Sequence, residues 1–84
     1  MTWEELEKYA ISNGAYKIIE YGNLGFEIGL VHFFQNGTVE FIAPGPDENY
    51  SNYLGDSEYP MDYEDMKIIM EILIKQEKKR NGNN

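Results

Sequence analysis

Hydrophobic residues near the start of the chain repeat with a helical period. A helix is predicted from Trp3 to Asn13, and its apolar face is made of Trp3, Leu6 and Ala10. Thr2 stands before this helix and Glu5 three positions later, which is the pattern of a capping box. Gly14 then accepts a positive φ, so the helix is expected to end there.

The end of the chain carries a second helical pattern. Asp62 is the expected N-cap, and the helix is predicted to fray near Arg80. Residues at positions i, i+3, i+4 and i+7 give this helix one apolar face, made of Met66, Ile69, Met70 and Leu73. Residues 81–84 are expected to form a flexible tail.

Between the helices the pattern changes to a two-residue period, which is typical of strands. Three strands are predicted, over Tyr16–Tyr21, Phe26–Phe34 and Thr38–Ala43. Asn36-Gly37 favours a two-residue type I′ turn, and this turn would pair His32 with Phe41. The predicted core face of the sheet then holds Phe26, Ile28, Leu30, His32, Phe34, Val39, Phe41 and Ala43.

These elements predict an α+β fold with the order α-β-β-β-α. A three-stranded antiparallel meander would have two helices packed on one face. Residues 47–60 are expected to form a polar loop, with at most a short strand at Ser51–Leu54. The 84-residue length favours one domain over residues 1–80.

The charge of the chain limits its partners. Fifteen acidic residues and seven basic residues give a net charge of −8. This charge opposes direct binding to nucleic acids or anionic membranes, and it favours a basic protein partner. No apolar run is long enough to span a membrane or to form a signal peptide, so a cytoplasmic location in a bacterial host cell is expected.

The chain offers few residues for catalysis. It has no cysteine and a single histidine, His32, which the strand pattern places on the core face. A catalytic triad needs a nucleophile, a base and an acid within reach of one another. Because His32 is the only candidate base and is predicted in the core, a structural role is favoured for it. We therefore expect a non-enzymatic protein with no cofactor, no metal ligands and no catalytic residues.

The acidic residues are concentrated in one segment. Residues 47–65 contain no basic residue and seven acids, namely Asp47, Glu48, Asp56, Glu58, Asp62, Glu64 and Asp65. Tyrosines, which are frequent in binding hot spots, are also dense there. The predicted partner-binding residues are Asp47, Glu48, Tyr50, Tyr53, Asp56, Glu58 and Tyr59. The alternative is a solvated loop whose acids serve solubility.

A second predicted surface lies on the last helix. Ile68 and Ile72 are neighbours at positions i and i+4, away from the apolar face that the helix turns to the core. Together they form an apolar strip suited to a homodimer or to a partner's groove.

Three segments resemble small proteins of phages and mobile elements of AT-rich bacteria: Thr2-Trp3-Glu4-Glu5-Leu6, Phe33-Phe34-Gln35-Asn36-Gly37-Thr38-Val39 and Met66-Lys67-Ile68-Ile69-Met70. The resemblance extends to anti-CRISPR and other anti-defence inhibitors. It implies an acidic protein that mimics nucleic-acid charge and blocks the basic surface of a nucleic-acid-handling complex. The alternative function is a structural or housekeeping interaction module, as a homodimer.

Overall fold

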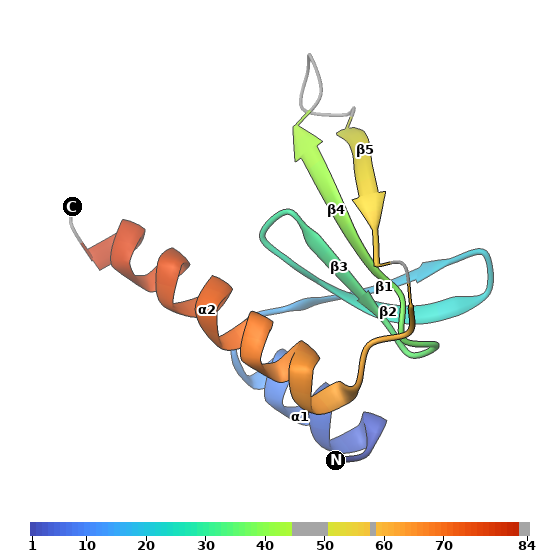
Figure 1. Ribbon diagram of the computed structural model, residues 1–84. Coiled ribbons are helices and arrows are strands. Elements are labelled where there is room, and N and C mark those ends of the chain that lie inside the picture. The colour runs from blue at the N-terminus through green and yellow to red at the C-terminus, as the bar shows by residue number, and fades with distance from the viewer. Residues whose placement is uncertain (45–50, 58, 83–84) are drawn as a thin grey trace.

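A computed structural model describes residues 1–44, 51–57 and 59–82 (Figure 1). The chain forms two helices and five strands, in the order α1 (Trp3–Ser12), β1 (Tyr16–Glu20), β2 (Asn23–Ile28), β3 (Val31–Phe34), β4 (Val39–Pro44), β5 (Ser51–Asp56) and α2 (Tyr63–Gly82). The predicted α+β class is confirmed. Helix α2 extends two residues into the predicted tail.

The strands form one antiparallel sheet in chain order, β1-β2-β3-β4-β5, so the predicted number of three strands is wrong. The predicted strand Phe26–Phe34 is two strands, because Gly29 has a φ of 60° and forms a two-residue turn with Leu30 between Ile28 and Val31. The fifth strand, β5, covers the segment for which a polar loop with at most a short strand was predicted.

The turn at Gly29-Leu30 also changes which residues face the core. The two residues of the turn break the alternation, so Val31 and Phe33 share a face with Phe26 and Ile28. Leu30, which was predicted in the core, lies in the turn and is 51% exposed. Phe34 is buried, but it lies on the opposite face of the sheet.

The hairpin between β3 and β4 differs from the predicted type I′ turn. Its loop has three residues, because Phe34 and Thr38 are joined by a backbone hydrogen bond of 2.9 Å. Gly37 has a φ of 97°, whereas Asn36 has no positive φ and accepts a hydrogen bond from the Thr38 amide at 3.0 Å. The longer loop shifts the register by one residue.

As a result, His32 pairs with Glu40 instead of Phe41. Phe41 pairs with Val31 on the helix side of the sheet, yet it is 41% exposed, so its predicted place in the core is also wrong. Figure 1 shows the reason, because β4 and β5 extend away from both helices. A register shift in the β4–β5 pairing, between Phe41 and Ile42, accompanies this extension.

Both helices pack on the same face of the sheet and share one hydrophobic core with it (Figure 1). The Trp3 ring stacks on Phe26, with ring centroids 4.8 Å apart. The predicted capping box of α1 is present, with the Glu5 amide donating to Thr2 Oγ1 at 3.1 Å and the Thr2 amide donating to Glu5 Oε1 at 2.8 Å. Within the described ranges, neither helix has the length and apolar character needed to cross a membrane.

Candidate functional site

The face of the sheet that the helices leave uncovered carries a row of polar residues. Paired residues of neighbouring strands lie side by side on the same face. The pairing therefore produces a row across the five strands, made of Tyr16, Glu27, His32, Glu40 and Asp56. We call this side of the sheet, with Glu20 and Phe34, the open face.

His32 lies at the centre of the row, and its side chain is only 12% exposed. Its Nε2 atom is 2.9 Å from Oε2 of Glu27. An ionised carboxylate only accepts hydrogen bonds, so Nε2 carries the proton and donates to Glu27. This contact fixes the orientation of the imidazole ring.

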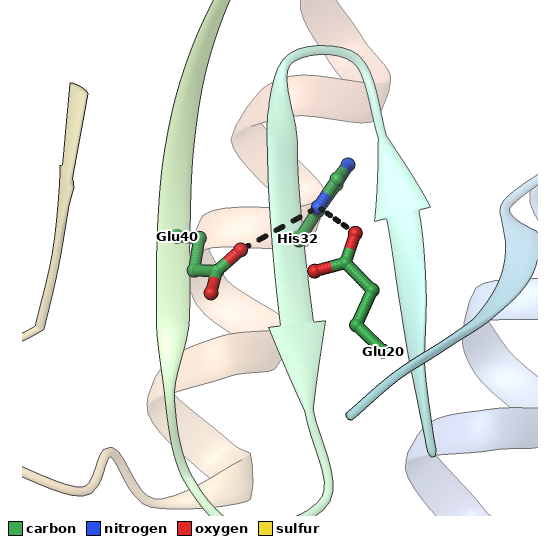
Figure 2. A group of neighbouring side chains, drawn as sticks. All are labelled: Glu20, His32 and Glu40. Carbon is green, nitrogen blue, oxygen red and sulfur yellow. Dashed lines mark ion pairs between the residues drawn. The ribbon is translucent and has the colours of Figure 1, made fainter. Parts of the chain in front are cut away.

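The other ring nitrogen of His32 points between two further carboxylates (Figure 2). Nδ1 lies 3.7 Å from Oε1 of Glu20 and 3.8 Å from Oε2 of Glu40, and both distances are too long for a hydrogen bond. Nδ1 is buried and has no hydrogen-bond partner. One ligand atom from each of the three residues lies within 4.8 Å of the others, so they form a cluster with the composition of a metal site.

The packing around His32 depends on a glycine in β2, the neighbouring strand. Phe34 is buried on the open face and pairs with Gly25 of β2. A Cβ atom on Gly25 would come within 2.7 Å of the Phe34 ring and 2.6 Å of the Phe33 carbonyl oxygen. The Phe34 ring therefore occupies the space above Gly25, and it meets His32 edge-on at a centroid distance of 6.3 Å. Phe34 supports one side of the cluster.

Negative charge dominates the open face. Burial raises the pKa of Glu40, and the charges of Glu20 and Asp56 raise it further, while His32 acts in the opposite direction. Among the described strand residues, none on this face is a lysine or an arginine. Lys17 lies on the other side of β1, where its Nζ is 3.9 Å from Glu7 of α1.

The prediction that His32 faces the core is therefore wrong. His32 was placed on the wrong face because Phe26–Phe34 was predicted as one strand. The turn at Gly29 divides this segment and moves His32 to the open face. Sequence analysis also missed Glu20, Glu27 and Glu40, because they lie far apart in the chain and become neighbours only through the sheet register. The dipeptide Gly29-Leu30 was the available signal for a turn, because glycine favours the first position of a type II′ turn.

The predicted partner-binding residues are partly described. Asp56 is exposed at the end of β5 and pairs with Glu40, so it joins the row on the open face. Tyr59 follows β5 and is 74% exposed. Tyr53 belongs to β5 and pairs with Ile42. Outside the described residues lie Asp47, Glu48, Tyr50 and Glu58.

The predicted apolar strip on α2 is exposed. Ile68 and Ile72 are 56% and 53% exposed, whereas Met66, Met70 and Ile74 of the same helix are buried in the core. The strip therefore lies on the side of α2 that faces away from the sheet. It is separate from the open face.

Comparisons of the chain with protein-family models, with curated proteins and with solved structures find no match.

Proposed function

We propose that this protein is a non-enzymatic inhibitor that binds a basic surface of a nucleic-acid-handling protein in the bacterial cytoplasm. The observation that supports the proposal is the open face, where Glu20, Glu27, Glu40 and Asp56 are gathered without a lysine or arginine among the described strand residues. A groove that binds phosphates responds to negative charge, so carboxylates spaced across a sheet can occupy it.

The exposed residues after β5 extend this surface in the proposal. Asp56 links the row of carboxylates to Tyr59, whose ring is largely exposed. Tyrosine gives a large contact area at a low cost in conformational entropy. The resemblance to anti-defence inhibitors adds the class of target, a complex that handles nucleic acids.

The proposal predicts separate roles for charge and contact area. Affinity capture from a bacterial host lysate with the wild-type chain would supply the partner, and binding kinetics would then be measured over a range of salt concentrations. Asp56→Lys should slow association and reduce its salt dependence, because charge steers the encounter. Tyr59→Ala should speed dissociation, at a cost of about 1–2 kcal/mol if the ring is a hot spot.

Glu4→Lys is the matched control, since Glu4 is also exposed but lies on α1, on the helix side of the molecule. The two lysine variants have the same net charge. Equal association rates for Asp56→Lys and Glu4→Lys would show that net charge alone matters, and the open face would then be rejected as the docking surface.

A specific observation favours a second candidate function, a homodimer through α2. Asp65 precedes Ile68 by three positions, and Lys75 follows Ile72 by three positions, and both charged residues are exposed. In an antiparallel pair of α2 helices, a two-fold axis between the isoleucines places Asp65 of one copy opposite Lys75 of the other. Such self-complementary contacts are what a two-fold interface requires.

Sedimentation velocity measurements would test this dimer. Ile68→Lys should convert a dimer to a monomer, whereas Glu77→Lys, farther along the exposed part of α2, should leave the dimer intact. A wild-type chain that stays monomeric at high micromolar concentrations would exclude the interface.

A further inference from the structure

The hydrogen bond between His32 and Glu27 leaves the other ring nitrogen of His32 facing two carboxylates. Nε2 donates to Glu27 at 2.9 Å, so in the neutral ring Nδ1 carries no proton. Its lone pair then points at two carboxylate oxygens, those of Glu20 and Glu40, with no hydrogen bond to either. Three electron-rich atoms that face one another in a partly buried position need a positive charge between them.

The three ligand atoms are close enough to share one cation. A Zn²⁺ ion about 2.0–2.2 Å from each of its ligands holds those ligand atoms roughly 3.3 Å apart in tetrahedral geometry. The two contacts of Nδ1 measure 3.7 and 3.8 Å. Both glutamate side chains are partly exposed, so small rotations are enough to bring their oxygens to bonding distance.

The contact between His32 and Glu27 is an independent indication of a metal site. Metal-binding histidines almost always donate their second ring N–H to a carboxylate, a carbonyl or water, which sets the tautomer and the ring orientation. Glu27 provides this partner from β2, at the ring nitrogen that does not face Glu20 and Glu40. One nitrogen of the His32 ring therefore contacts the Glu27 carboxylate, and the other nitrogen faces the carboxylates of Glu20 and Glu40.

We propose that Glu20, His32 and Glu40 bind a divalent transition-metal cation, with Zn²⁺ the best match, through Nδ1 and one oxygen of each glutamate. One imidazole with two carboxylates suits zinc and its neighbours, whereas Mg²⁺ and Ca²⁺ prefer sites made only of oxygen atoms. Three protein ligands leave a fourth position open to water. Glu27 is a positioning residue. The sequence-based expectation of no metal followed from placing His32 in the core.

This inference shares Glu20, Glu27 and Glu40 with the proposed docking surface, but its test is separate from the docking test. Asp56 is the carboxylate that the docking test changes, and it is not a ligand in the cluster. Failure of one test therefore leaves the other unaffected. The competing arrangement is a doubly protonated His32 that forms long ion pairs with both glutamates and binds no metal.

The single histidine of the chain makes the test direct. The untagged full-length chain would be treated with a chelator, exchanged into chelator-free buffer and titrated with Zn²⁺, while the two imidazole nitrogens are followed by ¹⁵N NMR. We expect one Zn²⁺ per chain, a large change in the Nδ1 resonance, and an Nε2 that keeps its proton. Mg²⁺ should bind at least roughly tenfold more weakly and leave Nδ1 unchanged.

Variants then test whether Zn²⁺ binds at the cluster or is attracted by the negative charge of the whole open face. Glu20→Gln and Glu40→Gln should each weaken Zn²⁺ binding by about tenfold or more, whereas Asp56→Asn, a neutralisation on the same face, should have little effect. Glu27→Gln should weaken binding by about 10–100-fold through loss of ring positioning, and it should also alter the tautomer signal of the metal-free protein.

Two results would overturn the proposal. In the first, Nδ1 does not respond to Zn²⁺, or both ring nitrogens stay protonated at saturating metal. In the second, Asp56→Asn weakens binding as much as Glu40→Gln does. Circular dichroism of each variant would show whether it folds, and the wild-type NMR titration does not depend on any variant.

Discussion

The two faces of the sheet differ although they are made by alternate residues of the same strands. On the side covered by the helices, Phe26, Phe33 and Val39 are fully or almost fully buried against Met66 and Met70. On the open face, carboxylates surround a histidine. In β3, for example, Phe33 contributes to the core while its neighbour His32 joins the cluster.

The contrast separates what stabilises the protein from what it can bind. Burial of apolar area is the main favourable contribution to folding, and the covered face supplies it. On the open face, burial of Glu40 and the nearby charges of Glu20 and Asp56 raise the pKa of the Glu40 carboxyl group, so its ionised form opposes folding. The proposed docking surface and the proposed metal site both lie on this face.

The sharpest test of the contrast is to remove one phenylalanine ring inside the core and one outside it. Phe33→Ala should reduce the free energy of unfolding by about 3–5 kcal/mol, because Phe33 is fully buried and its loss leaves a cavity. Phe41→Ala, also on the helix side but beyond the helices, should cost about 1 kcal/mol or less. Urea unfolding followed by fluorescence of the single tryptophan, Trp3, measures both.

If Phe33→Ala does not fold, Phe33→Leu gives the same comparison with a smaller loss of unfolding free energy. Equal costs at the two positions would mean that β4 is covered along its whole length, and the division into a packed part and an extended part would be wrong.

A second prediction concerns the tight packing of the open face at Gly25. Gly25→Ala should cost about 1–3 kcal/mol, because its Cβ would lie 2.6 Å from the Phe33 carbonyl oxygen and 2.7 Å from the Phe34 ring. Asn23→Ala lies on the same strand and face but at an exposed position, so it should cost less than about 0.5 kcal/mol. Chemical denaturation of the two variants tests the difference.

Gly25→Ala should also disturb the ring of His32, which Phe34 contacts. A Gly25→Ala protein as stable as Asn23→Ala would show that Phe34 can move away freely, and the cluster would lose its proposed support.

The smallest predicted effect concerns Glu40 and pH. The pKa of its carboxyl group is raised in the folded state, so the folded protein binds this proton more tightly than the unfolded chain. Stability therefore falls as the pH rises from the ordinary glutamate pKa through the raised one. Glu40→Gln should increase the free energy of unfolding by about 0.2–1 kcal/mol near pH 7, the range for like charges on paired strands.

Well below the ordinary glutamate pKa, Glu40 is protonated in both the folded and the unfolded state. There Glu40→Gln should not increase the free energy of unfolding. Urea unfolding at several pH values, with a chelator present, measures the difference, and Glu77→Gln, at an exposed position of α2, is the control. A gain that is the same at every pH would exclude the charge of Glu40 as its cause.

The helices were more predictable than the sheet. The capping box of Thr2 and Glu5, and the apolar face with Met66 and Met70, depend on residues a few positions apart, so the local sequence contains the needed information. Strand register depends on turn lengths instead. One additional turn at Gly29 and one additional loop residue before Gly37 changed the neighbours of His32.

The candidate site could not be predicted for the same reason. Glu20, His32 and Glu40 come from three strands, and no spacing along the chain marks them as a group. The acidic segment that the sequence analysis selected contributes Asp56 to the open face. The cluster becomes visible only when the three pairings from β1 to β4 are known.

The strand order also has a consequence for how the chain folds. Every strand pairs with its neighbour in sequence, and the first three connections are turns of two or three residues. Such local pairings close small loops and favour rapid folding. The contact between α1 and α2 instead joins the two ends of the chain. The hairpins are therefore expected to form early and the docking of α2 on α1 late, so the open face would exist before the helices cover the other side.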